Sequence, residues 1–141
     1  LVLSFHGVPR RTLELGDPYH CECIKTGRMI AEQIGLKPDF YTIAFQSRFG
    51  KEEWLQPYTE DVLAELPGQG VQTLVATCPG FTADCLETLD EVGTEGGEIF
   101  RHAGGEQLHL APCLNAHPRW LDAMASIIRS EAAGWQTRAT T

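Results

Sequence analysis

The sequence predicts an α/β domain built on a four-stranded parallel sheet, and two observations support this prediction. Short apolar or β-branched runs alternate four times with longer segments whose apolar residues have helical spacing. The run at 71–77 is almost entirely apolar, as in a central parallel strand. Elements that alternate in this order form a three-layer domain, with helices on both faces of the sheet and right-handed crossovers.

The first half of the chain is expected to hold two strands and one long helix. Residues 1–5 and 40–45 have the composition of strands. Between them, Asp17 is expected to be the N-cap of a helix that has Pro18 in its first turn and runs to about Ile34. The inward face of this helix is expected to consist of Cys23, Gly27, Ile30, Ala31 and Ile34.

In the second half, a short helix at 59–66 is expected before the apolar strand at 71–77. The next helix is expected to start at about Ala83. It either continues to Phe100 or stops early, because glycines weaken its later turns. Its inward residues are expected to be Cys85, Leu86, Leu89 and Val92.

The last predicted elements are a strand at 107–110 and a helix at 118–133. One domain is therefore expected over residues 1–135, followed by a disordered polar tail at 136–141. Because the chain begins inside a strand-like apolar run, we expect a fragment that lacks a preceding N-terminal domain. The apolar stripe of the last helix is expected to consist of Leu121, Met124, Ala125 and Ile128.

Composition and charge restrict the function. The net charge of −8 argues against a nucleic-acid partner, since phosphate binding requires a basic surface. No apolar run approaches the roughly 20 residues that span a membrane, and no signal-peptide pattern is present. The five cysteines are odd in number and lack C-x-x-C spacing, so reduced thiols and a cytoplasmic location are expected. Motifs for dinucleotides, nucleoside triphosphates and serine hydrolases are absent.

Two side chains that can handle metals or protons follow strands that are expected to be buried. His6 comes after the first strand, and Glu87 follows the break at 78–80 that ends the third strand. Ligands of open α/β sheets bind beyond the carboxyl ends of strands, so His6 and Glu87 are expected to face one cleft. For His6, the alternative is a strand-end histidine that only hydrogen-bonds the backbone.

Glu87 also begins a row of carboxylates, because Glu91 and Glu95 follow at a helical spacing of four residues. Such a row either is a solvated acidic helix face or guides a divalent cation or protons. Asp84 is expected either to support Glu87 or to lie favourably at the start of the helix. Ser47, after the second strand, is a further candidate, with a plain turn residue as the alternative.

Several segments together resemble the C-terminal half of protoporphyrin ferrochelatase, in the form found in proteobacteria. The resemblance covers the chain from Leu1 to about Ala133. The segments that carry it are Ser-Phe-His-Gly-Val-Pro at 4–9, Gly-Asp-Pro-Tyr at 16–19, Phe-Gln-Ser-Arg-Phe-Gly at 45–50, Trp-Leu-Gln-Pro-Tyr-Thr at 54–59, the stretch at 78–89 and Leu-Asn-Ala-His-Pro at 114–118.

The resemblance implies a two-domain lyase of haem biosynthesis, with Rossmann-like, chelatase-like halves and the porphyrin in the cleft between them. It implies that His6 delivers the metal or removes pyrrole protons, and that Glu87 handles protons. It also places His6 and Glu87 on the path of the metal, together with Glu91 and Glu95 on a helix that is often partly π-helical. Substrate contacts are implied at Ser47, Trp54, Pro79, Phe81 and Asp84.

By the same resemblance, the substrates are protoporphyrin IX and Fe²⁺, with Zn²⁺ or Co²⁺ as surrogate ions, and no permanent cofactor is expected. No iron–sulfur cluster is expected either, since no cysteine follows Cys113. The implied partners are the missing N-terminal half and, for the full enzyme, a peripheral membrane contact. Without that half, the isolated chain is expected to be inactive.

Two positions depart from the broader family pattern: Gly7 stands where many members have serine, and Cys85 where many have histidine. Two other functions remain open on the sequence alone. One is insertion of another metal into a tetrapyrrole, as in a cobalt chelatase. The other is a non-catalytic α/β module that binds a metal or a small molecule without turning it over.

Overall fold

A computed structural model describes residues 1–135 and contains one parallel sheet with the strand order β2-β1-β3-β4. The predicted α/β class and four-stranded parallel sheet are therefore confirmed. The tail predicted to be disordered, 136–141, lies outside the described residues. The strands are β1 (Val2–His6), β2 (Thr42–Gln46), β3 (Thr73–Thr77) and β4 (Gln107–Leu110).

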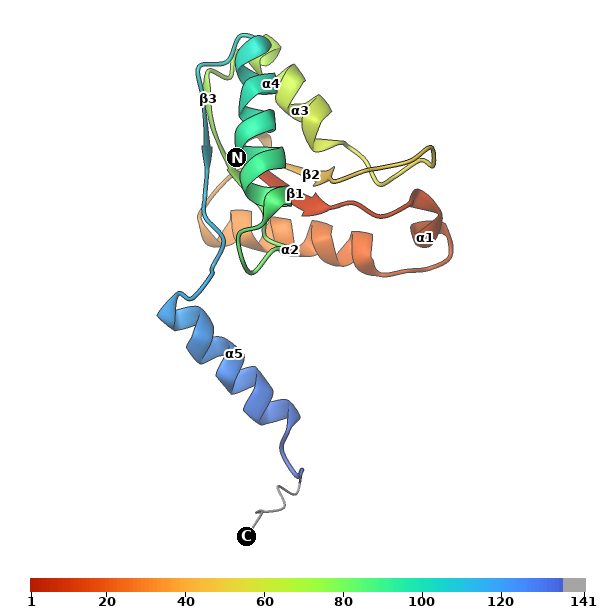
Figure 1. Cartoon of the computed structure of the whole chain (residues 1–141), viewed down its shortest axis with the longest axis vertical. Helices are drawn as coiled ribbons and strands as arrows, with labels where there is room; N and C mark the ends of the chain where they lie inside the picture. The colour runs from red at the N-terminus through yellow and green to blue at the C-terminus, as the bar shows by residue number, and fades with distance from the viewer. Residues whose placement is uncertain (136–141) are drawn as a thin grey trace.

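Helices cover the sheet on both faces, as Figure 1 shows. The long helix α2 (Tyr19–Gln33) packs on one face through Cys23, against Leu3, Phe5 and Phe45 of the strands. The other face is covered by α3 (Thr59–Glu65), the π-helix η3 (Glu87–Glu95) and α4 (Gly96–His102). Shorter helical turns are α1 (Arg10–Glu14), η1 (Pro38–Phe40) and η2 (Leu66–Gln69).

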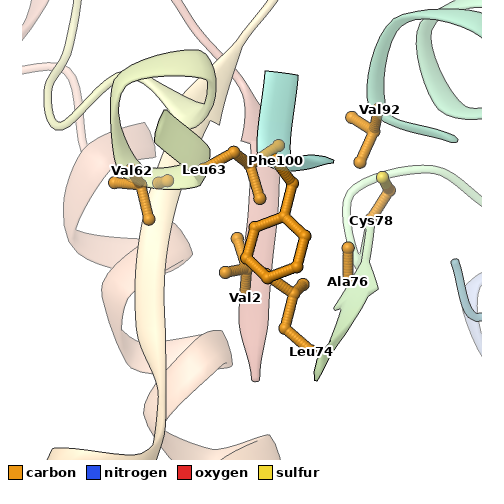
Figure 2. Packing of buried hydrophobic residues seen from close by; sticks show 9 residues of the cluster. Val2, Val62, Leu63, Leu74, Ala76, Cys78, Val92 and Phe100 are labelled. Atoms are coloured by element: carbon orange, nitrogen blue, oxygen red, sulfur yellow. The ribbon is translucent and has the colours of Figure 1, made fainter. Parts of the chain in front are cut away.

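The larger core lies between the sheet and α3, η3 and α4. Phe100 extends from α4 into its centre, where Val2 of β1 and Leu74 of β3 lie near the ring (Figure 2). Leu63 of α3 and Val92 of η3 belong to the same core cluster, and Phe100 is fully buried. Burying an aromatic side chain of this size stabilises a fold by several kcal/mol, so this contact fixes α4 on the strands.

Helix η3 packs differently from the prediction. Leu86 and Leu89 were expected to face inward but are 76% and 54% exposed, whereas Thr88 and Val92 are buried. The reason is the π-helical geometry, whose wider turns change which residues share a face. The helix continues through its glycines because they allow close packing: a Cβ on Gly96 would lie 2.9 Å from Leu63 Cδ1.

One half of the sheet is open on the α2 side. Val75 in β3 is 42% exposed, although the sequence predicted a strand covered on both faces; β3 is central and parallel as expected. The final helix α5 (Pro118–Glu131) stands away from the body of the molecule and has no buried residue (Figure 1). Its predicted apolar stripe is therefore unpacked, with Leu121 and Ile128 more than half exposed.

Element boundaries otherwise agree with the prediction to within a few residues. The strand predicted at 40–45 begins at Thr42, because Pro38–Phe40 forms the turn η1. Helix α2 begins at Tyr19 with Pro18 as its N-cap, one residue later than the predicted cap Asp17, whose Oδ1 accepts a hydrogen bond of 2.8 Å from the Tyr19 amide. Ile34, which was expected on the inward face, lies past the end of α2 and is exposed. In the part of the chain that the structure describes, no helix has the length and apolar character to span a membrane.

Candidate active site

The candidate site lies where the sheet divides. Strand β1 pairs with β2 along its whole length, from Val2 to His6, but with β3 only at Val2 and Leu3. The chain leaves β1 toward β2 on one side and leaves β3 toward β4 on the other. This is a topological switch point, where open α/β sheets bind their ligands beyond the carboxyl ends of the strands.

His6 ends β1 at this point and is half-buried. Its Nδ1 lies 2.6 Å from the Gly7 carbonyl oxygen, which can only accept, so Nδ1 carries the hydrogen. In the neutral ring, Nε2 is then free to accept a proton or bind a metal. The ring lies near Trp54 and Phe81, whose ring centroids are 6.4 and 6.2 Å from its own. The hydrogen bond to the backbone that the alternative interpretation of His6 predicts is therefore present, but it occupies only Nδ1 and leaves Nε2 available.

Gly7 permits this arrangement because the backbone passes close to β2 and to Trp54. Its amide donates a hydrogen bond of 2.8 Å to the Gln46 carbonyl oxygen. A Cβ on Gly7 would lie 3.0 Å from that oxygen and 3.1 Å from Trp54 Cε3, which is closer than ordinary van der Waals contact. Close packing therefore explains why this chain has glycine at position 7, where many members of the family have serine.

Glu87 begins η3 and is half-buried. A hydrogen bond from its own backbone amide lowers the pKa of its carboxyl, and a hydrogen bond from Cys85 and the positive charge of His6 lower this pKa further. Glu87 is therefore a carboxylate at neutral pH. Gln46, which pairs with His6 in the sheet, places its Nε2 2.5 Å from the Glu87 carbonyl oxygen, so the start of η3 lies over the end of the β1–β2 pair.

The other predicted acidic residues lie along the same helix. Glu87, Glu91 and Glu95 all line a groove of about 550 Å³, together with Ser47 and with Glu60 of α3. Glu91 is held by Ser47, whose backbone amide and Oγ lie 2.5 and 2.6 Å from its two carboxylate oxygens. Glu95 is exposed.

Asp84 lies outside this groove and stabilises a contact between two loops. Its Oδ1 accepts a hydrogen bond of 3.0 Å from the Cys113 amide, and its Oδ2 accepts one of 2.7 Å from Asn115 Nδ2. Asn115 Oδ1 in turn accepts a hydrogen bond of 2.9 Å from the Asp84 amide. These bonds, first that of Asn115 and then that of Cys113, lower the pKa of Asp84. The carboxylate thus holds the loop after β4, and its substrate role stays a prediction.

The structure brings the remaining candidates only partly together. Trp54 and Phe81 lie near His6, while Pro79 lies in the turn between β3 and η3. Within residues 1–135, no three His, Cys, Asp or Glu side chains are arranged to hold a metal ion. All five cysteines are free thiols, and only Cys23 and Cys78 are buried.

Sequence reasoning missed two polar residues that organise the site. Gln46 is buried at the end of β2 and contacts both Glu87 and Glu91, while Asn115 holds Asp84 with a backbone φ of 48°. The available signal for Gln46 was an amide that directly follows the apolar residues Ile43, Ala44 and Phe45 of a buried strand. For Asn115 the signal was weaker, since an asparagine before a helix is also an ordinary turn residue.

Comparisons with known proteins identify the family of the chain. The family model described as Ferrochelatase matches residues 1–132. Curated ferrochelatases from Nitrosomonas europaea and Methylibium petroleiphilum are 55% and 54% identical to the chain, over 98% of its length. The chain spans 38% of the length of each of these relatives.

A solved structure gives the same fold. The putative cobalamin biosynthesis protein CbiX from Marinobacter aquaeolei VT8 aligns with 92% of this chain and 93% of its own, with a TM-score of 0.57. At 20% identity this likeness shows the fold alone. The family match over nearly the whole chain, joined to the histidine and glutamate at the division of the sheet, places the protein in the ferrochelatase family.

Proposed function

We propose that this chain is the C-terminal, catalytic half of a ferrochelatase, which inserts Fe²⁺ into protoporphyrin IX to form protohaem. One observation carries the proposal: His6 ends β1 where β1 and β3 part, and its partner in the sheet, Gln46, lies with its Nε2 2.5 Å from the backbone carbonyl oxygen of Glu87 at the start of η3. Relatives of more than 50% identity that bear the name ferrochelatase support the substrate assignment. As a metal chelatase of this kind, the enzyme would be a lyase.

The residues suit the chemistry of metal insertion. Two pyrrole N–H protons must leave the porphyrin as one Fe²⁺ enters, so the charge of the macrocycle changes by two and bases are required. His6 Nε2 can accept one proton, because Nδ1 already carries a hydrogen that is bonded to Gly7. Glu87, ionised by the contacts that lower its pKa, can accept or pass on the other. Trp54 and Phe81, beside His6, supply apolar contact for a flat ring.

The groove along η3 supplies the route of the ion in this proposal. Fe²⁺ must exchange bound water for protein ligands, and carboxylate oxygens and imidazole suit it. Glu95 is exposed at the outer part of the helix, and Glu87 lies at its start. The predicted ligand role of Glu91 competes with its hydrogen bonds to Ser47. No permanent cofactor is required in this scheme.

The rest of the enzyme would supply the other wall of the cleft. We propose an N-terminal domain as partner of this half, in the cytoplasm, with a peripheral membrane contact in the full enzyme. An isolated chain is expected to bind porphyrin poorly and to be inactive, because a ring that stacks between two walls loses half of its contacts with one wall removed.

The test is metal insertion by this chain after fusion to the part of the Nitrosomonas europaea relative that it does not cover. Zn²⁺ insertion into protoporphyrin IX is followed by fluorescence, with Fe²⁺ and Co²⁺ compared under anaerobic conditions. We expect His6→Ala and Glu87→Gln each to lower kcat by about 10²-fold or more, as for other general bases. The controls are His109→Ala and Glu98→Gln, which change exposed residues of the same types that do not line the groove.

Two results would contradict the proposal. One is a wild-type fusion that folds and binds protoporphyrin but inserts no divalent ion, which points to a binding module. The other is full activity in both His6→Ala and Glu87→Gln. A strong preference for Co²⁺ over Fe²⁺ would instead favour the cobalt chelatase alternative.

A further inference from the structure

A buried chain of polar side chains connects α3, β1 and β2 to the start of η3. Ser4 is fully buried, and Thr59 and Gln46 are each 4% exposed. Ser4 Oγ donates to Gln46 Oε1 at 2.7 Å and accepts from Thr59 Oγ1 at 2.7 Å. Such a buried network is stable only when each polar group has its partner, and among the described residues every buried side-chain polar atom does.

This network fixes the orientation of the Gln46 amide. Its oxygen accepts from Ser4 and lies 3.5 Å from the Cys78 thiol, which burial keeps protonated by raising its pKa to about 12. Its NH₂ group must therefore face η3, where Nε2 lies 2.5 Å from the Glu87 carbonyl oxygen and 3.3 Å from Glu91 Oε2. A carboxylate at position 46 could not make these contacts, since it has no hydrogen to donate.

Ser47 completes the contact and does so in an unfavourable backbone conformation. Its φ is 64°, a region that non-glycine residues rarely adopt, and this φ directs the amide toward Glu91. The amide lies 2.5 Å from Glu91 Oε1, and Ser47 Oγ lies 2.6 Å from Oε2. Both oxygens of Glu91 are thus bound by protein donors, which leaves this carboxylate poorly suited to take up a metal ion.

We propose that Gln46, Ser47 and Glu91 form a latch that fixes the first turns of the π-helix on β2, so that Glu91 is a positioning residue for Glu87. The latch acts on Glu87 in two ways: Gln46 binds its backbone carbonyl, and Glu91 one turn later ties the helix to Ser47. The role given to Glu87 rests on the proposed function, whereas the latch itself is a property of the fold.

A π-helix needs such an anchor, because its wide turns are less stable than α-helical turns and occur mainly at functional sites. If η3 closed to α-helical geometry, the side chains along it would rotate relative to one another. Glu87 would then no longer keep its place at the end of β2, where Gln46 binds its backbone carbonyl oxygen. The latch therefore explains how an uncommon helix geometry is kept at the position where the acidic side chain is required.

The first experiment measures amide hydrogen exchange by NMR on the full chain, without any substrate. Glu91→Ala and Gln46→Met remove the hydrogen bonds, and we expect exchange of the Ser47 amide and of the amides at 88–92 to become about tenfold faster. Glu91→Gln keeps a carbonyl acceptor for Ser47 without the charge, so in this variant the same amides should exchange at rates near those of wild type. Glu98→Ala is the control, since Glu98 is exposed on the adjoining helix α4.

If Gln46→Met does not fold, Ser47→Gly and Glu91→Ala still test the latch. Ser47→Gly tolerates the positive φ and keeps the amide donor while it deletes Oγ, so its effect should lie between those of wild type and Glu91→Ala. Two results would overturn the latch. One is that the exchange rates of the Ser47 amide and of the amides at 88–92 are unchanged in Glu91→Ala, and the other is that these amides exchange as fast in Glu91→Gln as in Glu91→Ala.

The second experiment separates positioning from metal binding, in the fusion that inserts Zn²⁺. For a positioning residue, Glu91→Ala lowers kcat about tenfold with little change in the KM for the metal, and Glu91→Gln recovers most of the loss. For a metal ligand, Glu91→Gln and Glu91→Ala raise that KM equally, and this result contradicts the assignment. If the wild-type fusion inserts no metal while the exchange results hold, the proposed function fails and the latch stands.

Discussion

At the scale of single residues, the site depends on a backbone position where a side chain would be crowded. Gly7 lies between the Gln46 carbonyl oxygen and the Trp54 ring, at the residue next to His6. We expect Gly7→Ala to destabilise the fold by about 1–3 kcal/mol, as overpacking does elsewhere. Urea denaturation measures this change, and it should also disturb the neighbouring His6.

A matched glycine provides the control for this prediction. Gly97 is in α4, and a Cβ there would meet nothing within 4 Å. Gly97→Ala should therefore stabilise the fold by about 0.5–1 kcal/mol through helix propensity. Equal effects of the two substitutions would show that the close approach at Gly7 has no energetic importance.

Asp84 should make one loop contact dependent on pH. Its pKa is lowered in the folded state by the hydrogen bonds from Asn115 and Cys113, so the carboxylate favours folding above its ordinary value of 3.8. This contribution is lost as the pH falls below that value and through the lower pKa of the folded state. The NMR shift of the Cys113 amide, followed from about pH 6 to pH 2, should report the release. In Asp84→Asn this transition should be absent, and a wild-type midpoint above 3.8 would contradict the expected sign.

At the scale of elements, the helical segment from Glu87 to His102 joins the site to the core. Phe100 is fully buried in the larger core, whereas Leu89 is 54% exposed. We expect Phe100→Ala to lower the free energy of unfolding by about 3–5 kcal/mol and Leu89→Ala by less than about 0.5 kcal/mol. Guanidinium denaturation of the two variants measures both values. A larger loss in Leu89→Ala than in Phe100→Ala would mean that η3 packs with ordinary α-helical spacing.

The same segment shows which elements could be predicted from the sequence. Helix α2 and the strand at 107–110 follow from apolar spacing and end signals, and both agree with the structure. The inward face of η3 does not, because the prediction assumed α-helical spacing where the turns are π-helical. For α5, an apolar stripe predicted packing, but a stripe does not specify which surface it will meet.

The candidate site was predictable to a similar extent. The rule that ligands bind beyond the ends of parallel strands leads from the sequence to His6 and Glu87 without any contact being known. Gln46 could not be found in this way, because its importance comes from three partners that are distant in sequence, Ser4, Cys78 and Glu87. Sequence patterns show which residues follow a strand, but not which buried donors will find acceptors across the fold.

At the scale of the whole molecule, the body of the domain and α5 are nearly independent. Helix α5 has no buried residue and stands clear of the sheet (Figure 1). If the chain ends after His117, we expect the melting temperature to stay within about 2 °C of that of the full chain. Differential scanning calorimetry measures this shift. A fall of more than about 4 °C, roughly 1 kcal/mol for a domain of this size, would show that α5 supports the fold.

The open half of the sheet has a practical consequence. His109 lies beside Val75 in the β3–β4 pairing, and both are exposed. An imidazole in that position reacts readily with diethyl pyrocarbonate, whereas the His20 ring is stacked on Phe45 and gives a slower internal reference. The carbethoxylation rate of His109 therefore reports on the exposure of this part of the sheet. A polypeptide that covers β3 and β4 would shield the His109 side chain and slow its modification.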